Sequence, residues 1–476
     1  MTFTSGTYFI ALPLLALVYY MLPLKPQKVL LLAASLAFYW CNQPKYVLLL
    51  LICGGISYLT AWGIERWNGK KIGTAVLAAG CLAHFGLLFV LKYLNFFAGL
   101  VGVEQPVLTL LLPLGISFFT FSVTGYLFDV YRGKTARRKS VLDHMLFVCF
   151  FPCLLAGPIE KAREFFPQLE QRHSFRLEQV KWGALRFLYG LMQKLVLADT
   201  IAIPVNAMYS GELIQASWAA AVLLYSLQIY LDFAGYSNMA IGTAGILGFE
   251  IPENFTQPYL SISVRDFWKK WHISLTSWFR EYLYFPLGGS RRGKARRCFN
   301  ILVVFAVSGL WHGAAITYVL WGVINGLLQV IELMLDPLEE KIKKYMVWLP
   351  GLLQAFGKLL RGMVTYLLIS GTWVLFRAES VRQAVNVVKV ALRNLPYFRL
   401  LPENLGFTVV QFRVIAVLLL VVLVVDAARA TGKSVRHLAG TRAVFYTAVS
   451  LLILCSAVYG VYGQGFDPQS FVYFKY

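Results

Sequence analysis

The sequence predicts an all-α integral membrane protein that crosses the bilayer many times. Three observations lead to this prediction: 58% of the 476 residues are hydrophobic, only 14% are charged, and apolar runs recur along the whole chain. A soluble globular protein carries about 25% charged residues, whereas the mean hydropathy of this chain is +0.63. A soluble protein with one anchor or with an unusually apolar core is therefore disfavoured.

A membrane-spanning helix needs about 20 mostly apolar residues. Runs of this kind occur at 7–24, 28–41, 45–64, 73–99, 107–128, 140–156, 182–209, 216–234, 299–311, 314–335, 359–376, 409–426 and 443–462. Several are short or interrupted by Gly and Pro, which is typical of re-entrant helices that pack inside protein. We expect roughly eleven true spans plus re-entrant and interfacial helices, within a single domain over 1–476. The first run is expected to be a retained helix, because no charge precedes it and no cleavage site follows it.

Basic residues exceed acidic ones by 44 to 23, which gives a net charge of +21. They gather in short connections between apolar runs, at 25–28, 66–71, 132–139 and 291–297. Lys and Arg are retained on the cytoplasmic side of membrane proteins, so this placement explains the excess without nucleic acid binding. It predicts that residues 291–297 face the cytoplasm and that the N-terminus lies outside. The seven cysteines mostly lie in apolar runs, where small buried side chains are expected rather than metal ligands or disulfides.

The segment 250–298 is both aromatic and charged, and it is too polar to span the bilayer as one helix. Within residues 263–284 large apolar side chains recur every three or four positions, at Phe267, Trp271, Leu275, Trp278 and Tyr282. This spacing predicts one amphipathic helical stripe, opposite Lys269, Lys270 and Arg280. We expect 263–298 to form an amphipathic segment at the cytoplasmic membrane surface that anchors the chain, carries site residues, or does both.

Two of the six histidines stand in dense aromatic and polar surroundings. His272 lies in KKWHISLTSWFREYLY, and His312 lies in VSGLWHGAAITYVLWG. A histidine at membrane depth is a candidate functional residue, although a packed and hydrogen-bonded histidine is the commoner case. The sequence context alone leaves both a catalytic and a purely structural role open for His312.

Three further motifs carry polar residues. Asp232 interrupts an apolar run in YLDFAGYSNMAIG, and a buried carboxylate must be paired or protonated, so it belongs to helix packing or to a polar site. GPIEKAREFFP (157–167) is typical of a helix end at an interface. GGSRRGKA (288–295) has the glycine spacing of a phosphate-binding loop, but Ala295 stands where Ser or Thr would reach magnesium. A basic cytoplasmic segment is the expected role there, with attraction of an anionic cofactor or carrier protein as the alternative.

Four long motifs resemble the membrane-bound O-acyltransferases. They are GPIEK, YLDFAGYSNMAIG, NFTQPYLSISVRDFWKKWHISLTSWFREYLYFPLGGSR and GLWHGAAITYVLWG. The chain is most similar to the bacterial branch that contains the alginate O-acetyltransferase membrane subunit and the teichoic acid D-alanylation membrane protein. LPLGISFFTFSVTGYLFDVYRG (112–133) and the terminal FVYFKY (471–476) extend this resemblance over nearly the whole chain. LYFPLGGSR (283–291) favours the alginate-acetylation type.

The resemblance implies a helical membrane fold around a central tunnel or funnel, with His312 as the central catalytic residue and His272 as its paired site residue. An alcohol that attacks a thioester needs a base near neutral pKa, and histidine offers one. Asp266, Arg280, Glu281, Asp232 and Trp311 are the candidates for positioning substrate. Asn238, Ser122 and Ile316 depart from residues common in the family, which affects the expected acceptor rather than the histidines.

The implied reaction moves an acyl group, most simply acetyl, from a cytoplasmic thioester toward hydroxyls of an extracytoplasmic polysaccharide. The donor would be acetyl-coenzyme A or an acylated carrier protein, without a metal. Membrane lipid surrounds the chain, an esterase-like or acyltransferase-like outer protein is an expected partner, and the bacterial inner membrane is the expected location. D-alanyl transfer to teichoic acid from a carrier protein is the close alternative. A lipid or polysaccharide transporter is the rival from another class, which inverted repeats would favour.

Overall fold

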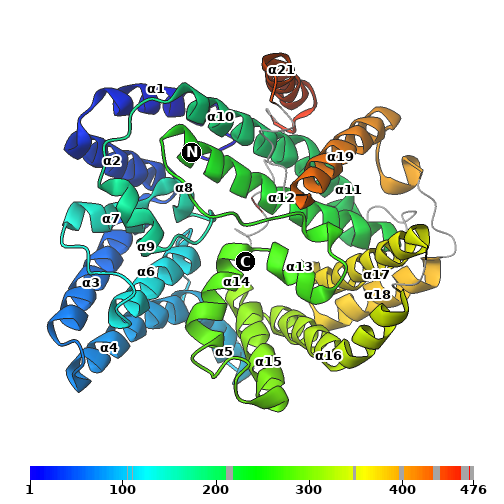
Figure 1. The fold of residues 1–476 in the computed structure, drawn as a ribbon, viewed down its shortest axis with the longest axis horizontal. Helices are drawn as coiled ribbons and strands as arrows, with labels where there is room; N and C mark the ends of the chain where they lie inside the picture. Colours follow the sequence, from blue (N-terminus) through cyan, green and yellow to red (C-terminus); the bar gives the residue numbers. More distant parts are fainter. Residues whose placement is uncertain are drawn as a thin grey trace. The chain divides into compact units, whose positions relative to one another are not determined.

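The computed structural model describes residues 1–103, 105–109, 111–210, 218–346, 350–395, 401–431, 440–462 and 471. These residues form helices joined by turns and contain no strand, which confirms the all-α prediction. The chain divides into two compact units (Figure 1). Unit 1 comprises Met1–Leu191 and Tyr236–Glu253, and unit 2 comprises Met192–Gly235 and Asn254–Tyr476. All but the first residue of the terminal FVYFKY motif lies outside the described residues.

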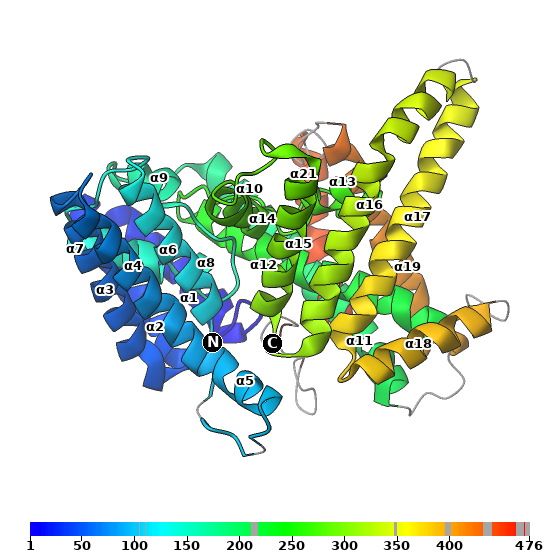
Figure 2. The same ribbon diagram turned by 90° about the horizontal axis from the view of Figure 1, so that it is seen from below.

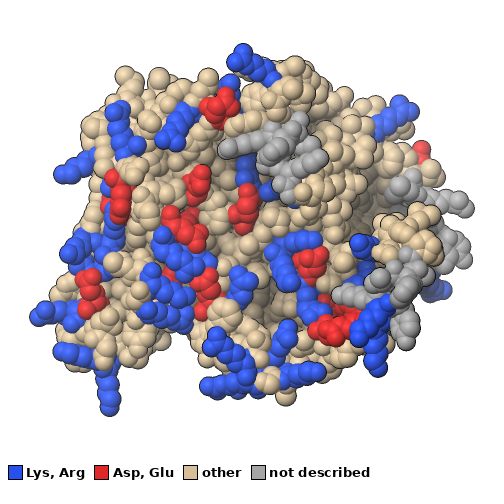
Figure 3. All heavy atoms as spheres, viewed as in Figure 1, with Lys and Arg blue, Asp and Glu red and all other residues tan. Residues whose placement is uncertain are grey.

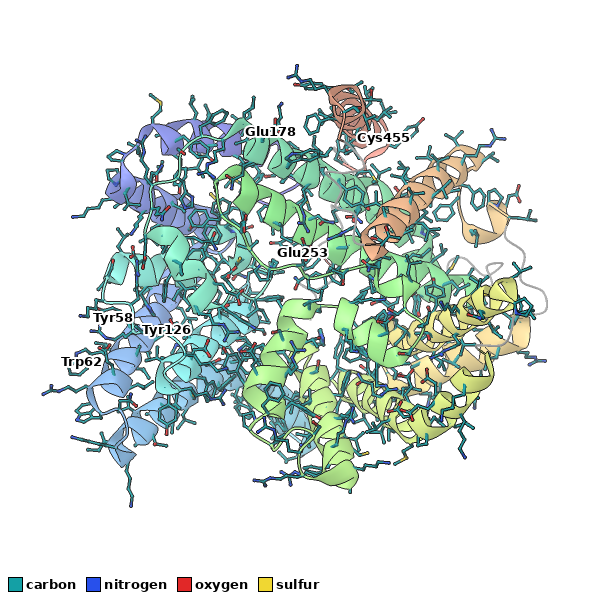
Figure 4. All side chains as sticks on the ribbon, in the orientation of Figure 1. Tyr58, Trp62, Tyr126, Glu178, Glu253 and Cys455 are labelled. Carbon is teal, nitrogen blue, oxygen red and sulfur yellow. The ribbon has the colours of Figure 1, made fainter. Side chains whose placement is uncertain are left out.

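Unit 1 holds the helices of the N-terminal part of the chain. They are α1 (Gly6–Met21), α2 (Leu24–Asn42), η1 (Pro44–Tyr46), α3 (Val47–Arg66), α4 (Lys71–Leu88), η2 (Phe89–Tyr93), α5 (Leu94–Leu100), α6 (Ile116–Tyr131), α7 (Val141–Cys149), α8 (Phe151–Leu154), α9 (Ala162–Phe165), η3 (Phe166–Leu169) and α10 (Leu177–Met192). Its core includes many aromatic rings: Tyr58 on α3 and Tyr126 on α6 (Figure 4) both pack against the buried ring of His144.

Unit 2 holds the rest of the chain. Its helices are η4 (Gln193–Ala198), α11 (Asp199–Ser210), the first part of α12 (Trp218–Ile246), η5 (Pro258–Leu260), α13 (Val264–Lys270), α14 (Ile273–Phe279), η6 (Arg280–Tyr284), α15 (Gly293–His312), α16 (Ile316–Met346), α17 (Gly351–Arg377), α18 (Val381–Asn394), η8 (Glu403–Leu405), α19 (Val409–Ala430) and α21 (Arg442–Tyr459). Helices α15 and α16 pack closely along each other as a hairpin.

Eight described helical segments are long and apolar enough to cross a membrane, so the chain is a multi-pass membrane protein. They are Pro44–Arg66, Lys71–Leu100, Leu177–Tyr209, Trp218–Ile246, Ile316–Ile342, Gly351–Arg377, Val409–Ala430 and Arg442–Tyr459. Gly6–Met21 is a shorter apolar helix. The total of roughly eleven spans of about 20 residues each, like the central tunnel, stays a prediction.

Two of the predicted runs are not continuous helices. In the run 107–128, helix α6 begins only at Ile116, because Gly115 adopts a positive φ of 76° that ends any helix entering from before it. In the run 140–156, the backbone leaves the helical region at Phe150, and α8 restarts with Pro152 in its first turn. Both runs are apolar, as predicted, but the hydrophobic pattern does not indicate where the backbone turns.

Candidate active site

The apolar stripe predicted over 263–284 is buried within the protein, but the segment is not one helix. Helix α13 ends at Lys270 and α14 begins at Ile273, with His272 between them at a φ of 44°. A positive φ is uncommon for a residue other than glycine, and such strained backbone persists where the surroundings hold it, often at functional sites. The continuous-helix prediction is therefore wrong at the very histidine that the resemblance singles out.

Asn254 holds this break in place. Its backbone oxygen accepts a hydrogen bond from the amide of Ile273 at 2.9 Å, and its side-chain oxygen accepts one from the Ser274 hydroxyl at 2.6 Å. The amide of Thr256 donates to the carbonyl of Lys270 at 3.1 Å, which ties the other side of the break to the same segment. Asn254 is fully buried. These bonds satisfy the helix ends on either side of His272.

His312 is the last residue of α15, next to Gly313 in an extended conformation. The hairpin of α15 and α16 depends on glycines, because a Cβ at Gly309 would collide with the backbone of Tyr318, and one at Gly313 with the Tyr318 ring. Small residues allow helices in membranes to approach this closely. The glycines of GLWHG thus bring the end of α15 against the start of α16 and fix the place of His312.

The two histidines lie together in unit 2, with ring centroids 6.5 Å apart. Both are buried. Trp311 contacts both rings, at centroid distances of 5.9 Å to His272 and 4.8 Å to His312. Other aromatic rings also contact the pair: the ring centroid of Phe233 lies 4.7 Å from that of His272, and those of Trp321 and Phe376 lie 5.2 and 5.0 Å from that of His312.

Burial in this aromatic enclosure affects the protonation of His272. Burial lowers the pKa of His272 from its ordinary value to about 3, because the apolar surroundings disfavour the charged ring. His272 is therefore a neutral imidazole at physiological pH. A neutral ring has one nitrogen that donates and one that accepts, so it suits orienting or polarising a substrate better than holding a proton.

Among the other predicted site residues, Trp311 contacts both histidine rings. Asp266 instead lines a surface cavity of about 570 Å³ in unit 2, where its carboxylate accepts a hydrogen bond from the Lys270 ammonium at 2.7 Å. Lys and Arg side chains mix with Asp and Glu on this face around α13 and α16 (Figure 3). Arg280 is exposed, and Glu281 lies 3.4 Å from the Ser277 hydroxyl within the same helical segment.

Asp232 is buried in unit 2 and forms an ion pair with Lys194, which also pairs with Asp199. Sequence reasoning singled out Asp232 but missed its partner Lys194, and it also missed Asp199 and Asn254. A signal for Lys194 existed, because a lysine inside the apolar run 182–209 is itself a candidate functional or paired residue. For Asn254 the signal was weaker, since it stood in a recognised motif without a chemical role.

The helices and this site together define a class: a multi-pass helical membrane protein with a buried histidine pair enclosed by aromatic rings. Residues 134–344 match the profile of the membrane-bound O-acyltransferase family. A probable alginate O-acetylase of Pseudomonas syringae is 36% identical over 81% of this chain and 74% of its own length. The peptidoglycan O-acetyltransferase of Helicobacter pylori is 33% identical over 77% and 74%, respectively.

The teichoic acid D-alanyltransferase of Bacillus subtilis is less similar, at 28% identity over 52% of this chain and 65% of its own length. The chain belongs to the membrane-bound O-acyltransferase family, and it is an O-acyltransferase. The resemblance inferred from the motifs is thereby confirmed, including the branches that it named.

Proposed function

We propose that this enzyme transfers an acetyl group from a cytoplasmic thioester to hydroxyl groups of an extracytoplasmic polysaccharide, with His312 and His272 as its catalytic pair. The observation that carries the proposal is the 6.5 Å separation of the two rings inside one aromatic enclosure. The names of the relatives support acetyl as the acyl group and a polysaccharide as the acceptor. We place the enzyme in the bacterial inner membrane, where a cytoplasmic donor and an extracytoplasmic acceptor lie on opposite sides.

We assign the two histidines different roles. His312 acts as general base toward the acceptor hydroxyl, since histidine is the side chain whose ordinary pKa is closest to neutral. His272, neutral through burial, orients or polarises the reacting groups. Trp311 holds the two rings in position by packing against both.

The reaction balances without any further reactant. The acceptor oxygen attacks the thioester carbonyl while His312 takes the hydroxyl proton. The carbon–oxygen bond forms, the carbon–sulfur bond breaks, and the proton passes from His312 to the departing sulfur. The products are an ester and a free thiol, either of coenzyme A or of a carrier protein. An outer partner protein would carry the acetyl group onward where the polysaccharide does not itself reach the site.

Thiol release tests the proposal directly. Purified protein in detergent is given acetyl-coenzyme A or an acetylated carrier protein with a hydroxyl acceptor, and free thiol is followed with a colorimetric reagent. Wild type should release thiol, whereas thiol release by His312→Gln should fall to the background rate. The matched control is His84→Gln, which removes another buried histidine, one whose ring forms hydrogen bonds with the carbonyls of Gly80 and Cys53 in unit 1.

Equal background release from wild type and His312→Gln with every donor, repeated in native membranes that contain the partner proteins, would overturn the proposal. Transport would then be the better account, because a transporter makes and breaks no bond in detergent. Release with a D-alanylated carrier but not with either acetyl donor would instead support the alternative that the teichoic acid D-alanyltransferases raise.

A further inference from the structure

Helix α18 (Val381–Asn394) is unlike the membrane-spanning helices of unit 2. It has 14 residues, so it is about 21 Å long and too short to cross a hydrocarbon core of about 30 Å. Figure 2 shows that it runs across the direction of α17, from which the chain has just turned. A short helix that crosses the spanning direction has the geometry of an element lying at a membrane surface.

One face of α18 packs on the protein. Ala384 and Val387 are buried in a cluster with Val374 and Ala378 from the end of α17 and the loop after it. Tyr209 on α11 and Trp218 on α12 cover the same cluster. This face therefore fixes how α18 is rotated, and the orientation of its other faces follows from helical geometry.

A second face is apolar and uncovered. Val385, Val388 and Leu392 are 46%, 37% and 67% exposed. At 3.6 residues per turn they fall within an arc of about 60°, centred about 100° around the helix from the packed face. An exposed apolar stripe on a helix that is already docked by another face needs a cover other than the described part of this protein.

A third face is basic. Arg382, Lys389 and Arg393 fall within an arc of about 40° that borders the apolar stripe on the side away from the protein. No ion pair among the described residues includes any of the three. Helix α18 contains no Asp or Glu, and the nearest carboxylate in sequence is the exposed Glu379 before its N-cap Ser380.

We propose that α18 is an anionic-lipid binding helix: Val385, Val388 and Leu392 enter the acyl chains of one leaflet, and Arg382, Lys389 and Arg393 bind the phosphates of acidic headgroups. The order of the three faces supports this occupant. Headgroup phosphates lie beside acyl chains at the membrane surface, as the basic stripe lies beside the apolar one. An acidic polysaccharide would match the basic stripe but would leave the apolar stripe facing water.

The test uses the full chain in lipid nanodiscs, with an environment-sensitive fluorescent amino acid at one position of α18. The probe replaces Leu392 on the apolar stripe or, as the matched control, Asn386 on the polar side of the same helix. Nanodiscs contain the same small fraction of either phosphatidylglycerol or phosphatidylcholine with brominated chains, which quench fluorescence on contact.

The probe at Leu392 should emit at shorter wavelength than the probe at Asn386 and be quenched more strongly by both brominated lipids. Brominated phosphatidylglycerol should quench it at least about twofold more than brominated phosphatidylcholine, since basic residues attract anionic lipid. The triple variant Arg382→Gln, Lys389→Gln, Arg393→Gln should lose this preference while keeping the quenching. All three side chains are exposed, so these substitutions should leave the fold intact.

Three results would overturn the proposal. A Leu392 probe that brominated lipids leave unquenched but aqueous iodide quenches would place the stripe in water. Equal quenching by the two lipids in wild type would show that α18 has no preference for anionic headgroups. Protection of the probe from iodide by an added acidic polysaccharide, without quenching by lipid, would assign the basic stripe to that polymer instead.

Discussion

The ammonium of Lys194 lies 2.6 Å from the Oδ1 atom of Asp232 and 2.7 Å from the Oδ1 atom of Asp199. All three side chains are buried, with exposures of 8% for Lys194, 1% for Asp232 and 3% for Asp199. Asp232 precedes Phe233, whose ring contacts His272 at 4.7 Å. The ion cluster therefore joins η4 and α11 to the part of α12 that packs against the site.

Removing the cation of this cluster should destabilise unit 2 strongly. Lys194→Met keeps the length of the side chain but leaves two buried carboxylates without their ammonium. Breaking a buried ion pair in this way costs about 3–5 kcal/mol. The thermal unfolding of the purified protein in detergent, followed by tryptophan fluorescence, should shift to lower temperature accordingly.

Lys181→Met is the matched control. Lys181 pairs with Glu178 at 3.3 Å on α10, where the Glu178 side chain is 74% exposed. A solvent-exposed pair contributes about 1 kcal/mol or less. An unfolding temperature lowered equally by both variants would show that burial of the Lys194 cluster has no special energetic role.

The two histidines should differ in how much activity depends on them. His312→Ala should abolish acyl transfer, since loss of a general base costs a factor of about 10² to 10⁴, or about 3–5 kcal/mol of barrier. His272→Ala should impair the reaction strongly but less completely. Initial rates of thiol release, normalised to the amount of protein in the membrane, measure both. Retention of most activity in His312→Ala would contradict the assignment.

Much of this site was predictable from the sequence because its residues occur in two continuous motifs. The aromatic stripe over 263–284 and the setting of His312 both follow local spacing, and both proved buried. Local spacing did not predict the break at His272, because that break depends on hydrogen bonds that Asn254 accepts from Ile273 and Ser274. A hydrogen bond between distant segments leaves no periodic signal.

The same limit explains the residues that sequence reasoning placed or missed. Asp266 and Arg280 share a motif with His272, yet helix rotation carries their side chains to the surface of unit 2 rather than to the histidine rings. Lys194 and Asp232 are 38 positions apart in the sequence numbering, and nothing in either motif indicates their pairing. Their link depends on tertiary packing, which a single sequence does not encode in its pattern.

Gly322 on α16 lies against the backbone of α15, and a larger residue there should disturb the site from a distance. A Cβ at this position would collide with the backbone oxygen of Phe305 on α15. Gly322→Ala should therefore push the hairpin apart and displace His312, and a shift of about 1 Å lowers rate about 10²-fold. Gly371→Ala on α17 is the control, since nothing lies within 4 Å of the added carbon.

Both glycine variants are compared by thiol release and by thermal unfolding. Gly371→Ala should keep the wild-type rate and gain up to about 1 kcal/mol of stability, because alanine favours helix over glycine. If Gly322→Ala also kept the wild-type rate, the close approach of the two helices would not be what positions His312.

Glu160, in the GPIEK motif of unit 1, should make stability depend on pH. Its side chain is buried, and burial raises the pKa of the carboxyl from 4.5 to about 8, with the nearby Glu164 adding to the effect. The amide and ammonium of Lys161 act in the opposite direction. The carboxyl is therefore protonated in the folded protein at neutral pH but ionised in the unfolded chain.

A carboxyl whose pKa is raised by folding stabilises the folded state fully below its unfolded pKa and loses that contribution as pH rises through its folded pKa. Between about pH 4.5 and 8 the free energy of unfolding should thus fall as pH rises. Glu160→Gln, which stays neutral, should flatten this dependence. Thermal unfolding of both proteins at several pH values in this window is the measurement, and equal slopes for wild type and variant would contradict the prediction.

The charge pattern predicts which residues reach each side of the membrane. Ser290 is exposed and directly precedes the basic residues of 291–297, so Ser290→Cys should react with a membrane-impermeant thiol reagent only after cells are permeabilised. Thr2 is exposed near the N-terminus, and Thr2→Cys should react in intact cells. Both changes are made in a Cys41→Ser background, because Cys41 is the exposed native cysteine among the described residues. Labelling of Ser290→Cys from outside intact cells would show that the topology is the reverse of the predicted one. It would also contradict our assignment of the thioester donor to the cytoplasmic side.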